Sequence, residues 1–394
     1  MNTLYLPILG YYDKKNDNLS IVIISLIDKI IKINDNEIQL LKNDVVSTKI
    51  NLNNNKFLFI DNNEIKLDID DDVEKRIKIF NCDCHFVPET GIWNKINNDK
   101  PFYSFHLGDQ IYNDLIFFKH CRIYNSIDKI NENIDKIKTD IFNNYLIAYK
   151  RKESVLQHSF NIFLGDDHEI VDDSIIKNLD PLVSGNLRQI YREVFQKIKT
   201  GLYNKNLLSL DNKSILLFDN IDTYNYLEYS QKLIDLINEN KKDFINDDLY
   251  IMSPRVLLNF KSDLIQTLIF QTDTNNNDYD ELYDTIFSLN KKVKIFCGDR
   301  HYISKYNIIL REKEKKISLY LVGPMNSIVE PRFSNYNLLD NNLELENEYQ
   351  HLQHGYISIE DKEITQNRYT CWLNKLFGPL IFAVKYLNAR YLSK

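Results

Sequence analysis

The sequence predicts an α/β protein with a small β-rich part at its N-terminal end. From residue 76 onward, short apolar runs of strand length alternate with long connections, which is typical of an α/β core. Three of these runs end in a Gly-Asp pair, although the chain has only 10 glycines in 394 residues. Before residue 76, β-branched runs are separated by Asn/Asp turn signals.

Length and composition fit one large domain and an accessory domain. The net charge of -7 argues against a surface that neutralises long stretches of nucleic acid. The 5 cysteines have no regular spacing that would predict a disulfide framework. We find no signal-peptide pattern and no apolar run of membrane-spanning length, so we expect a cytoplasmic protein without a membrane span.

The first expected domain is a β-rich accessory domain over residues 1–75. Runs such as 20–25 and 56–60 have the composition of strands, and Asn/Asp clusters between them indicate turns. This part contains no His or Cys, so we expect no chemistry from it. The acidic stretch at 68–72 marks the expected boundary.

The second expected domain spans residues 76–394 and carries the candidate strands 76–80, 102–107, 160–164, 293–297 and 317–322. Between them, the stretches 115–158 and 174–290 are expected to be mostly helical, and a C-terminal helix is expected at about 368–392. Ligand sites in open α/β sheets lie beyond the carboxyl ends of strands. We therefore expect the loops after these strands to converge.

The loops after these strands are rich in carboxylate and imidazole groups. The most concentrated is Asp166-Asp167-His168-Glu169, directly after an apolar run. Carboxylates packed this closely repel one another unless a cation offsets their charge. Several Asp and His side chains on separate loops suit two adjacent metal ions that share one carboxylate. The sequence therefore predicts a metal centre.

Three motifs follow one another in the chain: Gly108-Asp109-Gln110-Ile111-Tyr112, Asp166-Asp167-His168-Glu169 and Gly298-Asp299-Arg300-His301. Each motif follows an apolar run. In their residues and their order, the three motifs resemble those of the PhoD-like metallophosphatases, a branch of the calcineurin-like metallophosphoesterase superfamily. The resemblance covers roughly residues 76–330. It implies a four-layer α/β/β/α core with helical insertions. It also implies a divalent metal pair (Fe, Mn, Ca, Mg or Zn) and hydrolysis of a phosphate ester by a metal-bound hydroxide.

The resemblance assigns roles position by position. Asp109 would bridge both metals, and Tyr112 would bind an iron-type metal as phenolate. His168 would act near the leaving group. Arg300 departs from the family pattern, which has an apolar residue at this position, and it is either a phosphate clamp or a solvated side chain. Asp166 and Glu169 are expected to orient their neighbours. The expected metal ligands are Cys82, Asp83, His85, Asp109, Tyr112, Asp167, Asp299 and His301.

Two questions stay open at this point. The first motif offers Cys82, Asp83 and His85 as alternative ligands. In addition, no His or Cys lies between His168 and Cys297, so the isolated histidine of the superfamily is missing. An oxygen ligand in its place would favour a harder ion. The alternative function is therefore a catalytically inactive member of the fold that acts as a binding or structural protein.

Overall fold

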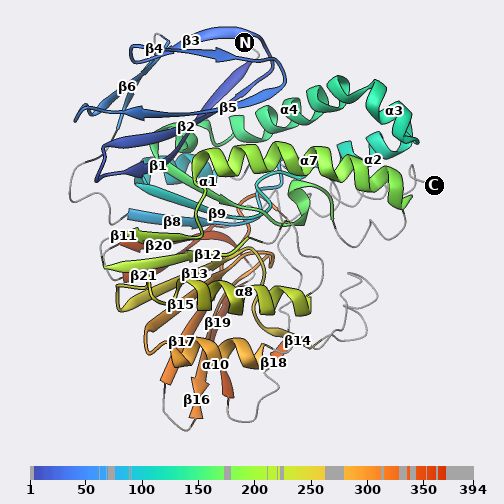
Figure 1. Cartoon of the computed structure of the whole chain (residues 1–394). Coiled ribbons are helices and arrows are strands. Elements are labelled where there is room, and N and C mark those ends of the chain that lie inside the picture. Colours follow the sequence, from blue (N-terminus) through green and yellow to red (C-terminus); the bar gives the residue numbers. More distant parts are fainter. Residues whose placement is uncertain are drawn as a thin grey trace.

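The computed structural model describes residues 4–369 except 62, 68, 70–75, 88, 90, 173–178, 211, 220, 222–225, 262–278, 312–314, 328–334, 338–342, 352 and 361–362. Its strands form five sheets, and helices pack against several of them (Figure 1). The predicted α/β class is confirmed.

Two antiparallel sheets make up the N-terminal part. The first contains β1 (Tyr5–Asp13), β2 (Asn18–Ser25) and β5 (Asp44–Asn51). The second contains β3 (Lys29–Ile33), β4 (Asn36–Leu40), β6 (Phe57–Ile60) and β7 (Asn63–Lys66). The middle of β2, residues 21–24, is apolar and is buried on both faces. Ile21 and Ile23 belong to the central core, whereas Val22 and Ile24 face helices.

A five-stranded sheet follows, in the order β10-β9-β8-β20-β21. Strands β8 (Arg76–Phe80), β9 (Tyr103–Leu107) and β10 (Phe160–Leu164) run parallel, so their carboxyl ends lie at one edge. Strand β20 (His354–Glu360) pairs with β8 and β21 (Glu363–Tyr369) pairs with β20, and both pairings are antiparallel.

The seven-stranded sheet has the order β11-β12-β13-β15-β17-β16-β19. Its parallel strands are β12 (Lys213–Leu217), β13 (Asp248–Ser253), β15 (Lys292–Cys297) and β17 (Lys315–Leu321). Three pairings are antiparallel: β11 (Leu207–Leu210) with β12, β16 (Ile303–Leu310) with β17, and β19 (Leu343–His351) with β16. Strands β14 (Asn259–Lys261) and β18 (Asn335–Asn337) form a separate two-stranded antiparallel sheet.

The five-stranded and seven-stranded sheets share one apolar core. Ile79 and Phe105 of the first sheet and Met252 and Phe296 of the second belong to the same cluster, and each is at most 1% exposed. Burial of side chains of this size stabilises the fold by roughly 1.5–3 kcal/mol each. This packing fixes the two sheets relative to each other and brings their strand ends together.

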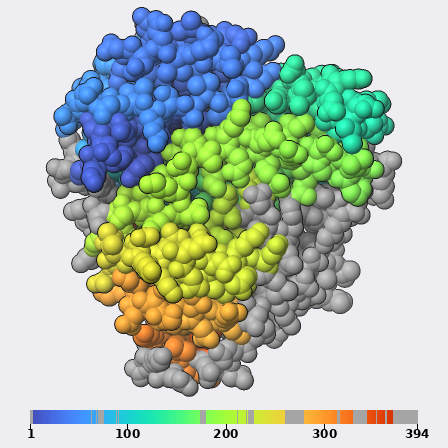
Figure 2. All heavy atoms as spheres, viewed as in Figure 1, coloured from blue at the N-terminus to red at the C-terminus, as the bar shows by residue number. Residues whose placement is uncertain are grey.

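Helices cover the outer surfaces of these sheets. Helices α8 (Tyr226–Asn240) and α10 (Asp280–Ser288) share a core with β13 and β15. Helix α7 (Pro181–Leu202) packs with β2 and β10 and begins at Asp180, whose Oδ1 accepts hydrogen bonds from the N–H groups of Leu182 and Val183. Figure 2 shows the N-terminal residues in blue beside the green residues of α7.

The expectation of helices at 115–158 is confirmed by α2 (Asp114–Ile123), α3 (Ile127–Glu132), α4 (Ile134–Lys150) and α5 (Glu153–His158). A further helix, α1 (Ile92–Asp99), lies before β9. The expectation of a mostly helical stretch at 174–290 is wrong in part, because β11, β12, β13 and β14 also lie there. The strands β12 and β13 are short apolar runs in the interior of a parallel sheet, where side chains on both faces are buried and no alternation is visible.

Most of the expected C-terminal helix at about 368–392 lies outside the described residues. Its first two positions, Arg368 and Tyr369, end strand β21 instead of beginning a helix. Within the described part of the chain, no helix is long and apolar enough to cross a membrane.

Candidate metal centre

The loops after β8, β9, β10, β13 and β15 meet at one place, and two glycines show how closely they approach. A Cβ atom on Gly108 would lie 2.7 Å from the Cβ atom of Asp166 and 3.1 Å from that of Pro254. A Cβ atom on Gly298 would lie 2.5 Å from the carbonyl oxygen of Leu107 and 2.7 Å from Oδ1 of Asn81. Only glycine permits backbones to pass this closely. The predicted convergence of the strand-end loops is thus present.

Three of these loops hold a residue other than glycine in the left-handed backbone region. The φ angles are 45° at Cys82, 54° at Asp109 and 64° at Asp299. This conformation is costly for residues with a Cβ atom, and such strain is concentrated at functional sites. Glycine would adopt this backbone conformation at lower cost, so the side chains of Cys82, Asp109 and Asp299 are candidates for a functional role.

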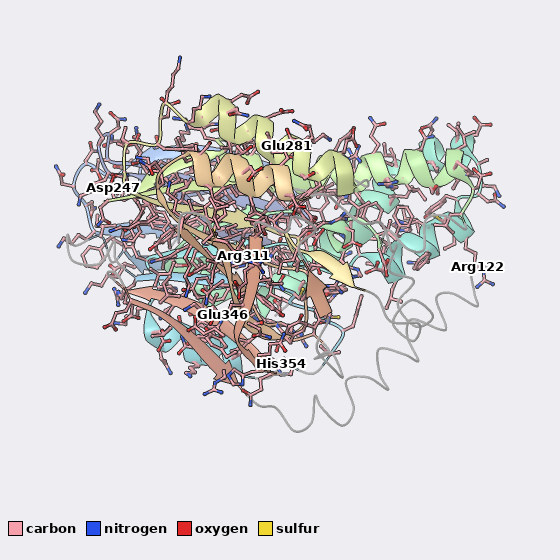
Figure 3. The ribbon with its side chains drawn as sticks, turned by 90° about the horizontal axis from the view of Figure 1, so that it is seen from below. Arg122, Asp247, Glu281, Arg311, Glu346 and His354 are labelled. Atoms are coloured by element: carbon pink, nitrogen blue, oxygen red, sulfur yellow. The ribbon has the colours of Figure 1, made fainter. Side chains whose placement is uncertain are left out.

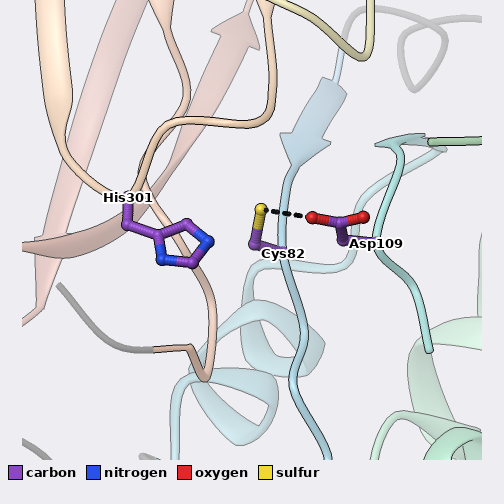
Figure 4. A group of neighbouring side chains, drawn as sticks. All are labelled: Cys82, Asp109 and His301. Atoms are coloured by element: carbon purple, nitrogen blue, oxygen red, sulfur yellow. Dashed lines mark hydrogen bonds between the residues drawn. The ribbon is translucent and has the colours of Figure 1, made fainter. Parts of the chain in front are cut away.

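The first group of ligand-type side chains consists of Cys82, Asp109 and His301, which follow β8, β9 and β15. One potential ligand atom from each lies within 4.8 Å of the others. The Sγ of Cys82 donates a hydrogen bond to Oδ2 of Asp109 over 3.2 Å (Figure 4). We call these three residues the first group.

Asp109 is only 3% exposed, and its Oδ1 has no hydrogen-bond partner among the described residues. Burial raises the pKa of Asp109 to about 7, and burial together with the charge of Asp109 raises the pKa of the Cys82 thiol. A cation between these atoms would satisfy the orphaned oxygen and favour both ionised forms. Thiolate, carboxylate and imidazole are together a donor set for zinc or iron.

Tyr112 lies beside the first group. Its hydroxyl donates to Oδ2 of Asp109 over 3.4 Å and lies 3.5 Å from Oγ of Ser327. Its ring stacks on the imidazole of His168 with a centroid distance of 4.1 Å. The phenol oxygen is therefore close to the carboxylate that the family resemblance predicts to bridge two metals.

The second group consists of Asp109, Asp167 and His168, whose potential ligand atoms also lie within 4.8 Å of one another. Asp167 and His168 stand on the 3₁₀ turn η1 (Asp167–Glu169), shortly after β10. Asp109 belongs to both groups. Two metal positions that share this carboxylate are therefore sterically compatible with the structure.

Asp114, which the sequence interpretation missed, orients His168. Its Oδ2 lies 2.9 Å from Nδ1 of His168, and its Oδ1 accepts the N–H of Asp172 over 2.7 Å. Because a carboxylate only accepts, Nδ1 carries the proton and Nε2 is the other functional atom of the ring. The available signal was an acidic residue at the start of a helix, two positions after Tyr112.

Glu169 ties the loops after β9 and β10 together. It is completely buried, and its carboxylate accepts the N–H groups of Asp109 over 3.1 Å, Gln110 over 2.5 Å and Asp166 over 2.7 Å. Asp166 forms a capping box with Glu169 around η1. The prediction that Asp166 and Glu169 orient their neighbours is confirmed.

Asp83 does not join either group. Its Oδ2 lies 2.9 Å from Nζ of Lys152, and its Oδ1 accepts hydrogen bonds from Asn326 over 2.7 Å and Trp93 over 3.3 Å. Although burial opposes it, the charge of Lys152 holds the pKa of Asp83 below its usual value. Asp83 is thus an internal ion-pair partner, and this geometry argues against its predicted role as a ligand.

His85 also lies outside both groups. Its Nε2 is 2.8 Å from Oδ1 of Asn144, and burial lowers its pKa to about 4. Of the three alternatives in the first motif, the structure therefore brings only Cys82 into a group of potential ligands.

Asp299 and Arg300 lie at the end of β15, beside the groups. The N–H of Asp299 donates to Oδ1 of Asn81 over 3.3 Å, and its Oδ2 lies 3.6 Å from Nε of Arg300. The Arg300 side chain is 18% exposed, so it is not freely solvated. Asp299, a predicted ligand, is in neither group of the described residues.

A buried arginine at the end of β13 also escaped the sequence interpretation. Arg255 is 6% exposed, and its Nε donates to Oδ1 of Asp166 over 3.2 Å. The segment around it, Ser253-Pro254-Arg255, contains no His, Cys or carboxylate, so the sequence gave no indication that this residue lies near a metal site.

No family model matches the sequence, and the curated proteins contain no match. The fold, however, is similar to solved structures. A structure of PhoD matches with a TM-score of 0.57 over 98% of this chain and 97% of that chain, at 10% identity. The chain has the fold of PhoD. A structure of the purple acid phosphatase PPD1 from yellow lupin (Lupinus luteus) seeds matches with a TM-score of 0.55, over 92% of this chain and 71% of that chain, at 9% identity.

The likeness to PhoD confirms, at the level of the fold, the resemblance suggested by the three motifs. It covers nearly the whole chain, whereas the motifs reached only from about residue 76 to about residue 330. The structure adds that Asp109, Asp167, His168 and His301 of these motifs come together in space with Cys82.

Proposed function

We propose that this protein is a metal-dependent phosphoesterase of the PhoD-like type, acting on phosphate mono- or diesters. The observation that carries the proposal is the pair of ligand groups that share Asp109 at the carboxyl ends of the strands. The purple acid phosphatase with the same fold is a phosphatase by its name, which supports the same reaction class.

The residues present fit a pair of metal ions. Cys82, Asp109 and His301, with Tyr112 beside them, would hold an iron or zinc ion. Asp109 and Asp167 would supply oxygen ligands for a harder ion such as Mn²⁺, Mg²⁺ or Ca²⁺. When bound, such ions acidify a water molecule and offset the negative charge of a phosphoryl group.

His168 is the proposed proton donor to the leaving oxygen. The Asp114 carboxylate holds the proton on Nδ1, and the stacked ring of Tyr112 fixes the plane of the imidazole. These two contacts direct Nε2 as the atom that exchanges a proton with substrate. The Glu169 carboxylate binds the backbone N–H groups of Asp109 and Asp166 and so holds the two loops together. This contact fixes the position of His168 relative to the ligand groups.

We further propose that residues 1–75 form an accessory domain and residues 76–394 the catalytic domain, with a four-layer α/β/β/α core. The core shared by the two central sheets and the packing of α8 and α10 outside the seven-stranded sheet support this arrangement.

The test combines metal analysis with an assay. Protein purified without chelator is analysed by inductively coupled plasma mass spectrometry, and p-nitrophenyl phosphate and bis-p-nitrophenyl phosphate are offered with added Mn²⁺, Ca²⁺ or Fe²⁺. We expect bound metal and hydrolysis of at least one ester, with Asp109→Asn losing both. Absence of metal and of hydrolysis would reject the proposal and favour the inactive binding or structural protein.

A further inference from the structure

A group of lysines surrounds a hollow at the amino ends of β15 and β17. The hollow has a volume of about 370 Å³, which is within the range of small-molecule sites. Five of the residues that line it are lysines, and no carboxylate lines it among the residues that the structure describes. We call these five residues the lysine cluster: Lys291, Lys292, Lys294, Lys315 and Lys316.

The lysine cluster is remote from the candidate metal centre. Lys292 is the first residue of β15, whereas Cys297 is its last and stands at the edge of the sheet where the strand-end loops meet. A strand of this length spans about 16 Å. Neither group of potential metal ligands includes a residue of the lysine cluster. The hollow is therefore a separate feature of the seven-stranded sheet.

The two lysines that begin β17 have weak partners. Nζ of Lys315 donates to Oδ1 of Asn290, a neutral group, over 2.8 Å. Nζ of Lys316 lies 4.0 Å from Oε2 of Glu346, which is labelled in Figure 3. The side chains of Lys316 and Glu346 are 48% and 55% exposed, so water screens this long contact. Neither lysine is neutralised by a close carboxylate among the described residues.

The two lysines before β15 have no ion pair and no side-chain hydrogen bond among the described residues. Lys291 and Lys292 follow helix α10, whose C-terminal end attracts cations. This end of a helix is equivalent to about half a negative charge, so it balances only a small part of five ammonium groups.

Lys294 shows that positive charge accumulates at this end of the sheet. Burial lowers the pKa of Lys294; the charge of Asp248 opposes this effect, and the charges of Lys213, Lys305 and Lys292 add to it. An anion in the hollow would reduce the repulsion between these ammonium groups.

We propose that the lysine cluster binds a compact anion that carries two or more phosphate groups, such as a short phosphate chain. One phosphate group carries about two negative charges at most, so two or three are needed to match five ammonium groups. Lysine binds phosphate as a point charge and needs no fixed geometry. The small hollow and the net charge of -7 favour a compact anion over a long nucleic acid. The site goes beyond the proposed function, because no ligand of the metal centre belongs to it.

The experiment measures the binding of sodium tripolyphosphate to the full chain by isothermal titration calorimetry. We expect binding that weakens at least about 10-fold when NaCl is raised from about 50 mM to about 500 mM, because salt screens the charges. Inorganic phosphate and citrate should bind at least about 10-fold more weakly than tripolyphosphate, because the first carries one phosphate group and the second none.

The double variant Lys291→Gln/Lys292→Gln should weaken tripolyphosphate binding at least about 10-fold. Its metal content and its hydrolysis of p-nitrophenyl phosphate should equal those of the unaltered protein. The matched control is Lys14→Gln/Lys15→Gln, which removes the same two charges from the exposed turn between β1 and β2. This control should bind tripolyphosphate as the unaltered protein does.

Three results would overturn the inference: no binding of tripolyphosphate, equal affinity in the two double variants, or binding of citrate as tight as that of tripolyphosphate. Each of them leaves the proposed function intact, which fails instead if metal and ester hydrolysis are absent. If Lys291→Gln/Lys292→Gln does not fold, Lys316→Gln on the exposed start of β17 decides between these results by the same comparison.

Discussion

The buried ion pair between Lys152 and Asp83 gives the sharpest stability prediction. Nζ of Lys152 lies 2.9 Å from Oδ2 of Asp83, and the two side chains are 0% and 2% exposed. Nζ also donates to the carbonyl oxygen of Gln110 over 3.1 Å and lies over the rings of Trp93 and Tyr149. Replacement of Lys152 by methionine keeps the aliphatic stem but leaves the carboxylate unpaired.

At 2.9 Å, two unit charges attract by about 6 kcal/mol with an effective dielectric constant of 20, before desolvation is subtracted. Loss of one partner from a buried pair destabilises proteins by about 3–5 kcal/mol, a large part of a total stability of about 5–15 kcal/mol. We expect Lys152→Met to lower the free energy of unfolding in urea by this amount.

The double variant Lys152→Met/Asp83→Asn removes both charges and should recover at least half of the loss. It should also retain the metal, because Asp83 belongs to neither ligand group. A cost of less than 1 kcal/mol for Lys152→Met would refute the ion-pair argument. Loss of metal from the double variant, with its fold intact, would show that Asp83 is a ligand after all.

Three further predictions concern the site and its surroundings. Asp114→Asn should lower kcat by roughly 10²–10⁴-fold at unchanged metal content, because the amide lacks the negative charge that holds the proton on Nδ1 of His168; an unchanged kcat would remove Asp114 from the mechanism. Asp109→Asn should lower metal content and lower kcat/KM by at least about 100-fold, and protein that keeps its metal would contradict its place in both groups. Burial lowers the pKa of His106 from 6.5 to about 3, so below pH 6.5 the unfolded chain binds a proton that the fold excludes. Unfolding free energy should therefore fall by up to about 1.4 kcal/mol per pH unit as pH decreases from 6.5, and His106→Gln should show a shallower slope in urea unfolding at pH 7, 6 and 5.

The strand-end loops could be predicted from sequence because apolar runs that stop at Gly-Asp are local signals. Their order also identified Asp109, Asp167, His168 and His301, which the structure brings together. The strands β12 and β13 could not be distinguished from buried helix segments in the same way, since a strand buried on both faces loses its alternation.

The remaining differences between expectation and structure concern partners that are distant in sequence. Asp83 stands in an Asp-x-His pattern typical of a metal ligand, but Lys152, 69 positions later, neutralises it. Arg255 and Asp114 contribute through the residues they contact, and a single sequence carries no information about such contacts. The three-residue window that contains Arg255 has no feature that separates it from an ordinary loop.

The most direct test of the central claim is the metal content of protein purified without chelator, measured together with that of Cys82→Ala. The structure predicts at least one transition-metal ion per chain in the unaltered protein and its loss from the variant, because Cys82 is the only member of the first motif in a ligand group among the described residues. Equal metal content in the two proteins, both correctly folded, would contradict the metal centre described here.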